Sequence, residues 1–222
     1  MDLRVPTTFL RGFFEYLFYS ILPDCRIFGE KSSVILEPIC ALKIEDMNIV
    51  DWKLIDEWID DSFDLAKVRT RMEEAINHAD GSDLEQVLHP PIAKNVFELD
   101  DNPFLYPGQR LAEFLYEFLP RTPDLSEFTD GICHFHPIGD ADLSDADYRA
   151  MRRFASAMER YGKKHIVALI VAKGDPHKYI EKSTESKSQF VKYMMRDLKN
   201  ISFNARVFYP EKDDKCIVVS IT

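Results

Sequence analysis

Residues 131–147 read GICHFHPIGDADLSDAD and hold the densest group of metal-capable side chains in the chain. The first six residues have β-strand character, and alternate residues of a strand lie on one face, about 6.5–7 Å apart along the chain. We therefore expect His134 and His136 to face the same side and to bind one ion together. Pro137 ends the predicted strand, because proline cannot donate a hydrogen bond to a sheet.

A helix is expected to follow this strand, beginning near Ser144. Apolar residues recur three to five positions apart between Leu143 and Met158, which is typical of an amphipathic helix. Asp147 falls in its first turn. Two imidazoles and one carboxylate form the ligand set of a catalytic zinc site, which keeps a fourth position for water. The residues therefore predict a zinc site made by His134, His136 and Asp147.

Two roles fit Ser144. Its hydroxyl, one helical turn before Asp147, could hydrogen-bond the oxyanion that forms on an attacked carbonyl group. The spacing of the two residues also resembles a capping box, in which a serine and an acidic residue three positions later bind free N–H groups at a helix start. Helix caps are common, so this interpretation stands beside the catalytic one.

Residues 134–147 resemble the H-x-H-P-x6-S-x-x-D signature of the JAB/JAMM (MPN-domain) zinc metalloproteases, and residues 136–140 resemble the H-P-S-G-D segment of the RadC branch of that superfamily. The positions that match the signature are His134, His136, Pro137, Ser144 and Asp147. In the family the two histidines and the aspartate bind zinc and the serine supports the oxyanion. The resemblance implies the same roles here.

The family's general acid/base is an upstream glutamate in an E-x-x-G-like context, and this chain departs from that pattern. Asp24 holds the nearest position, and Gly29 follows it too closely. If the turn of a predicted hairpin is centred on Lys31, Asp24 and Glu37 lie opposite one another, with Cβ atoms about 5 Å apart. We expect Glu37 or Asp24 to be the catalytic base, with Glu30 next. Alternatively, both are solvated carboxylates at a hairpin end.

The fold that the resemblance implies is an α/β domain of JAB/JAMM (MPN, cytidine-deaminase-like) type, with a mixed β-sheet flanked by helices. A length of 222 residues fits a single domain, 1–222. Residues 46–91 are interpreted as a helical insertion, with a helix over 51–79, because a minimal JAB/JAMM domain has no counterpart to them. Trp52 and Trp58 in this segment either pack against the rest of the domain or form a partner surface.

Composition narrows the class of protein. A net charge of −10 argues against a general binder of nucleic acid or anionic membranes. The chain has no run of 18 apolar residues, which a membrane-spanning helix would require. The four cysteines form no C-x-x-C pair and are predicted to be reduced, buried thiols of a cytoplasmic protein. The oligomeric state is left open.

The resemblance implies a hydrolase with a zinc cofactor. It would be a metallopeptidase or isopeptidase that cleaves a peptide or isopeptide bond in a protein or peptide substrate, commonly a bond to a ubiquitin-like or other small protein tail. The missing E-x-x-G context favours an alternative, a RadC-like or degenerate member that binds zinc and acts through protein–protein contacts without hydrolysis. In a further alternative zinc is absent, and residues 46–91 are the surface of a binding module.

Overall fold

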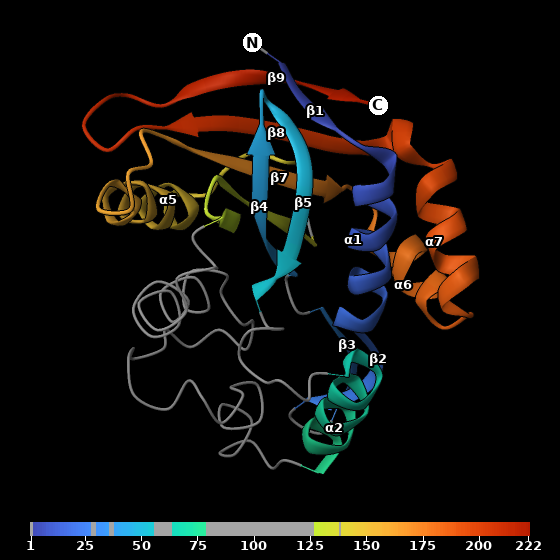
Figure 1. Cartoon of the computed structure of the whole chain (residues 1–222). Helices are drawn as coiled ribbons and strands as arrows, with labels where there is room; N and C mark the ends of the chain where they lie inside the picture. Colours follow the sequence, from blue (N-terminus) through green and yellow to red (C-terminus); the bar gives the residue numbers. More distant parts are fainter. Residues whose placement is uncertain (1, 28–29, 36–37, 56–63, 79–126, 138) are drawn as a thin grey trace.

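The computed structural model describes residues 2–27, 30–35, 38–55, 64–78, 127–137 and 139–222 (Figure 1). Within these ranges seven strands close into a barrel in the order β1-β5-β4-β6-β7-β8-β9. In chain order these strands are β1 (Asp2–Val5), β4 (Ile39–Glu45), β5 (Asn48–Leu54), β6 (Gly131–His136), β7 (Ile166–Lys173), β8 (Ile201–Phe208) and β9 (Lys215–Ile221).

Closure of this barrel contradicts the predicted JAB/JAMM sheet flanked by helices. Strand β1 runs parallel to β9, where Leu3 pairs with Val219, and it also pairs with β5 through Arg4 and Asn48. Strand β1 is also parallel to β5, and β6 is parallel to β7. The remaining neighbours in the barrel, β4–β5, β4–β6, β7–β8 and β8–β9, are antiparallel. The fold prediction is therefore wrong, because a sheet whose first strand joins both ends has no open edges.

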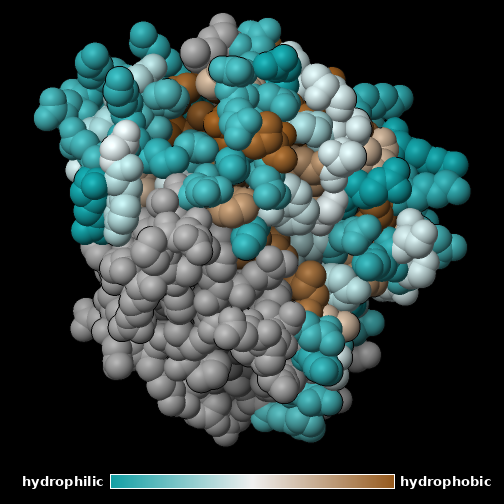
Figure 2. All heavy atoms as spheres, in the orientation of Figure 1, coloured by the Kyte–Doolittle hydropathy of each residue, from teal (hydrophilic) through white to brown (hydrophobic). Residues whose placement is uncertain are grey.

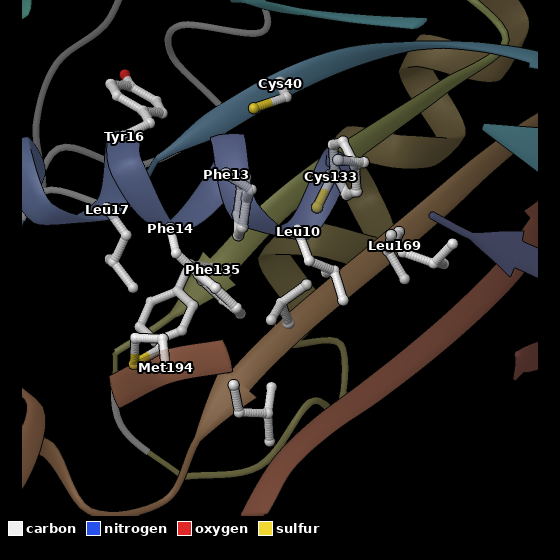
Figure 3. Close-up of a cluster of buried hydrophobic side chains, with 14 of the residues drawn as sticks. Leu10, Phe13, Phe14, Tyr16, Leu17, Cys40, Cys133, Phe135, Leu169 and Met194 are labelled. Atoms are coloured by element: carbon white, nitrogen blue, oxygen red, sulfur yellow. The ribbon is translucent and has the colours of Figure 1, made fainter. Parts of the chain in front are cut away.

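Five α-helices lie within the described ranges: α1 (Thr7–Ser20), α2 (Leu65–His78), α5 (Asp145–Glu159), α6 (Pro176–Ser183) and α7 (Lys187–Arg196), with a short 3-10 helix η4 (Leu198–Asn200). Helices α1, α6 and α7 lie on one side of the barrel and α5 on another (Figure 1). Figure 3 shows side chains from α1, the strands and α7 meeting in one buried cluster, which includes Phe14, Phe135 and Met194. All eight residues of β7 are buried, because its run of apolar residues packs on both faces of the strand.

The predicted hairpin is present, but its register differs from the one expected. Strand β2 (Ile21–Ile27) pairs with β3 (Glu30–Ile35), and Arg26 lies opposite Lys31. Lys31 is therefore a strand residue rather than the centre of the turn, and the expected opposition of Asp24 and Glu37 is wrong. Asp24 lies where the register shifts, between Leu22 and Cys25, and has a positive φ of 57°.

In the described part of the segment predicted as one helix over 51–79, a strand precedes the helix, so the prediction is wrong for its first residues. Its first part belongs to β5, and a helix, α2, follows over Leu65–His78. The Trp52 ring lies edge-to-face on Phe9, with ring centroids 5.6 Å apart, and covers Gly12 of α1, which supports packing against the domain. Trp58 lies outside the described residues. The 46–91 insertion and the single-domain assignment stay predictions.

The surface of the described part is mostly hydrophilic on the face shown in Figure 2. None of the described helices combines the length and apolar character of a membrane span. Cys40 and Cys133 are buried free thiols, as predicted, and burial raises the pKa of Cys133 well above its usual value. Cys216 is exposed, so the prediction that all four cysteines are buried is wrong.

Candidate metal centre

His134 and His136 lie in the last three residues of β6, where pairing with neighbouring strands holds the backbone. His134 lies opposite Ile39 of the antiparallel β4 and beside Ile170 of the parallel β7, and His136 lies beside Ala172. Because alternate strand residues share a face, both imidazoles extend to the same side of β6. Their Nε2 atoms are 2.9 Å apart, which confirms the predicted convergence.

Asp147 reaches the same point from the first turn of α5. Its Oδ1 lies 3.3 Å from Nε2 of His134, and its Oδ2 lies 3.2 Å from Nε2 of His136. The side chains are only 4% exposed for His134, 14% for His136 and 11% for Asp147. The His134-His136-Asp147 cluster could therefore hold a metal ion, as the sequence predicted.

A capping box holds Asp147 in this position. Ser144 is the N-cap of α5, and its Oγ accepts a hydrogen bond of 3.1 Å from the Asp147 backbone N–H. In return, Asp147 Oδ2 accepts from the Ser144 backbone N–H at 2.8 Å and from the Ser144 hydroxyl at 2.6 Å. The capping role predicted for Ser144 is confirmed, and one carboxylate serves both the helix start and the cluster.

The oxyanion role of Ser144 remains a prediction, and it requires the Ser144 hydroxyl to be free to donate to the substrate. A serine hydroxyl has one O–H donor. In the structure that donor is directed at Asp147 Oδ2. To stabilise an oxyanion, the Ser144 hydroxyl would have to turn from Asp147 towards the substrate. This exposed residue has room for such a rotation.

The charge state of the cluster favours a cation. Burial raises the pKa of Asp147, but hydrogen bonds from His134, His136 and Ser144 lower it by more than burial raises it. The pKa of Asp147 therefore lies well below its ordinary value. Nδ1 of His136 lies 3.3 Å from the Asp140 carbonyl oxygen, so a proton on Nδ1 can be donated to that oxygen. In that tautomer His136 Nε2 no longer donates to Asp147 and instead presents a lone pair towards His134 and Asp147. A cation bound between the three groups would then take the place of the shared protons.

The loop between β6 and α5 is anchored to the barrel beside the cluster. Ala141 is buried against Ile170 and Ala172 of β7. Asp142 accepts a 3.3 Å hydrogen bond from the side-chain amide of Asn204 in β8. The sequence did not single out Asn204, because nothing local to it indicates that β8 lies two strands from His134.

The candidates for the general base are not brought to the cluster within the described residues. Asp24 is exposed, and no hydrogen bond or ion pair between described residues joins it to the cluster. Glu37 lies outside the described residues, and Glu30 begins β3. The nearest described neighbour of Glu37 in the chain is Pro38, whose carbonyl oxygen accepts a 3.3 Å hydrogen bond from the Phe135 backbone N–H. The identity of the base stays a prediction.

Comparisons with known proteins do not assign the chain to a family, since no family model and no curated protein matches it. The resemblance to the JAB/JAMM signature rests on the sequence of residues 134–147. The case for a function rests on the cluster and its surroundings.

Proposed function

We propose that the chain is a zinc-dependent metallopeptidase or isopeptidase that cleaves a peptide or isopeptide bond, such as one to a ubiquitin-like or other small protein tail. The observation that carries the proposal is the convergence of His134, His136 and Asp147 at one point. Ser144 lies beside them, 2.6 Å from the carboxylate. The signature H-x-H-P-x6-S-x-x-D, in which the JAB/JAMM metalloproteases have the same residues, supports the reaction class and the substrate class.

The donor set favours zinc over other metals. Two imidazole nitrogens and one carboxylate are the ligands of many catalytic zinc sites, whereas magnesium and calcium prefer oxygen ligands only. Donors bound to a tetrahedral zinc at about 2.0–2.2 Å lie about 3.3–3.6 Å from one another. The contacts of 2.9, 3.3 and 3.2 Å between the three side chains approach this size, so small ring rotations would fit the ion.

The side chains would then divide the work of hydrolysis. Zinc, when bound, would polarise the scissile carbonyl and lower the pKa of a water molecule towards neutrality. His134, His136 and Asp147 hold the ion, with the His136 ring oriented by the Asp140 carbonyl. The Ser144 hydroxyl would rotate to donate to the developing oxyanion. A carboxylate would remove the proton from the water and return it to the leaving amine.

Glu37 is the stronger candidate for this carboxylate. Glu37 directly precedes Pro38 in the sequence. Pro38 is hydrogen-bonded to Phe135, the residue between the two histidines. Asp24, in contrast, is exposed on the β2–β3 hairpin.

The exposure of Asp24 also favours a second candidate function. If neither Asp24 nor Glu37 acts as a base, the chain would be a RadC-like or degenerate zinc-binding scaffold that acts through protein–protein contacts. Such a protein would bind zinc with the same three ligands and would not hydrolyse a peptide bond.

Metal binding is tested first, by elemental analysis and zinc titration of the purified chain. We expect one zinc per chain in the wild type and none in His136→Ala, because two remaining ligands hold zinc poorly. His165→Ala is the matched control, since His165 is an exposed histidine outside the cluster, and it should keep a full equivalent. A full equivalent of zinc in His136→Ala would show that the ligands are assigned wrongly.

Hydrolysis is tested next, with ubiquitin-like proteins fused through a peptide bond or linked to lysine through an isopeptide bond. Glu37→Gln keeps the shape of the side chain and removes only the proton acceptor, so zinc should stay bound while turnover collapses. Asp24→Asn should remain active. Wild-type hydrolysis by both variants would place the base elsewhere, with Glu30 next. A wild type that binds zinc and cleaves none of these substrates would favour the scaffold.

A further inference from the structure

We infer that Tyr179 of α6 is a positioning residue for the metal centre, which it serves by holding the Pro137 carbonyl and thereby His136. The inference rests on the metal site of the proposed function and adds a residue that lies on the opposite side of β6 from the cluster. It concerns the affinity of the site for metal and does not depend on which substrate is cleaved.

The contact between Tyr179 and the ligand strand is direct. The Tyr179 hydroxyl donates a 2.5 Å hydrogen bond to the carbonyl oxygen of Pro137, the residue after His136. The Tyr179 ring is fully buried and meets Phe135 edge-to-face, with centroids 5.8 Å apart and planes at 87°. Burial and the nearby charge of Asp175 raise the Tyr179 pKa, so the hydroxyl stays protonated and remains a donor.

The bond acts where the strand ends. His136 is the last residue of β6, paired with Ala172 of β7, and Pro137 has no N–H with which to continue the sheet. On the other side, the Phe135 N–H donates to the carbonyl of Pro38, the residue before β4. Beyond these points the backbone after His136 needs another restraint. The Tyr179 hydroxyl supplies one at the next carbonyl.

Proline makes this restraint effective at His136. The pyrrolidine ring fixes φ of Pro137 near −65°. One free backbone torsion, ψ of Pro137, therefore sets the position of the Pro137 carbonyl relative to the His136 Cα, and ψ of His136 then sets the direction of the His136 side chain. A hydrogen bond that holds the carbonyl limits both. The His136 Cα is then restrained, while the contact of Nδ1 with the Asp140 carbonyl orients the ring.

Loss of the Tyr179–Pro137 hydrogen bond should weaken the binding of metal. Partners that orient a ligand typically contribute 10- to 100-fold to metal affinity. Tyr179→Phe keeps the ring against Phe135 and removes only the hydroxyl. We therefore expect the Kd for zinc to rise about 10- to 100-fold. The absorption spectrum of the cobalt-substituted protein should change as well, because His136 is less well held.

A matched control is Tyr193→Phe in α7. The Tyr193 hydroxyl is buried and makes no hydrogen bond within the described residues, so this substitution removes a phenolic hydroxyl without breaking a bond to the ligand strand. The Kd for zinc and the cobalt spectrum should both match the wild type. The titrations use zinc and cobalt ions alone, on the full chain, with thermal unfolding of each metal-free variant recorded in parallel.

Pro137→Ala provides an independent test of the same link. It frees φ at position 137 but keeps the Tyr179 hydroxyl, so it should weaken zinc binding even if Tyr179→Phe fails to fold. When both substitutions fold, their effects should be less than additive, because they act through one carbonyl.

The outcomes separate this inference from the proposed function. Unchanged zinc affinity in Tyr179→Phe, or in Pro137→Ala if Tyr179→Phe does not fold, would overturn the inference and leave the metal site intact. Equal losses in Tyr179→Phe and Tyr193→Phe would also overturn it, because the effect would then be general. A wild-type chain that binds no zinc or cobalt would overturn both.

Discussion

Ser144→Ala distinguishes a serine that only caps α5 from one that also takes part in catalysis. The substitution removes the acceptor of the Asp147 backbone N–H and the hydroxyl that donates to Asp147 Oδ2 at 2.6 Å. The backbone N–H of Ser144 remains, and it keeps its 2.8 Å bond to the carboxylate. Half of the capping box survives, so α5 should still form and Asp147 should still face the histidines.

The two roles of Ser144 predict effects of different size on different quantities. Loss of a serine N-cap costs about 1 kcal/mol of folding free energy. For a chain of more than 200 residues this lowers Tm by about 2–4 °C. Water can replace part of the lost bond, because Ser144 is exposed. Loss of an oxyanion donor lowers kcat by about 10²- to 10³-fold.

The chain offers a matched control in Ser186→Ala. Ser186 caps α7 with a second capping box, in which its Oγ accepts from the Gln189 backbone N–H at 3.4 Å. This box is not in contact with the cluster, so its loss should lower Tm by a similar amount and leave kcat unchanged. Thermal unfolding by circular dichroism and hydrolysis of a ubiquitin-like fusion measure the two quantities on the same preparations.

One pattern of results would refute the catalytic role of Ser144. If Ser144→Ala and Ser186→Ala lose similar stability and both retain wild-type kcat, Ser144 is a helix cap and nothing more. A large loss of bound zinc in Ser144→Ala would point instead to a role in holding Asp147. Zinc content is therefore measured on each variant before kcat is compared.

Two further predictions concern stability. Gly12→Ala would place a Cβ atom 2.3 Å from Cζ2 of Trp52, so the ring must shift, and we expect a loss of about 1–3 kcal/mol in urea unfolding, whereas unchanged stability would contradict the packing described. A hydrogen bond from buried Lys173 lowers the pKa of Asp197 below its ordinary value of 3.8. The Lys173–Asp197 ion pair therefore stabilises the fold fully above pH 3.8, and this contribution is lost as the pH falls below that value. The unfolding free energy of the wild type should thus fall more steeply in acid than that of Asp197→Asn, and parallel pH profiles would contradict this.

The metal cluster was predictable from sequence because it follows from local rules. Alternation in a strand places His134 and His136 on one face, and a capping box places Asp147 at the start of a helix. The spacing between the strand and the helix is short, which leaves few ways to connect them. Local geometry therefore determines the three ligands, and the structure brings them together.

Closure of the barrel could not be predicted in the same way. It depends on β1 pairing with β9, and so on contacts such as Leu3 with Val219 that join the two ends of the chain. No periodicity within either segment indicates the partner strand. The same limit applies to Tyr179 and Asn204, whose bonds to the ligand loop cross 42 and 62 residues of sequence.

The general base shows how a local signal can mislead. The turn of the predicted hairpin was centred on Lys31, but Lys31 is paired with Arg26. Strand β2 also contains a register shift between Leu22 and Cys25. A shift of this kind changes which residues face one another, so the argument that placed Asp24 opposite Glu37 fails. The pairing of β4 with β6 bears on the same choice between Asp24 and Glu37.

That second pairing separates the two candidates. Ile39 lies opposite His134, and the Pro38 carbonyl accepts a hydrogen bond from the Phe135 N–H, so the start of β4 lies beside the end of β6 that carries the histidines. Glu37 precedes Pro38 in the sequence, whereas Asp24 lies on the hairpin with its side chain exposed. If hydrolysis depends on Glu37 and not on Asp24, the register of β4 against β6, rather than that of the hairpin, determines where the base lies.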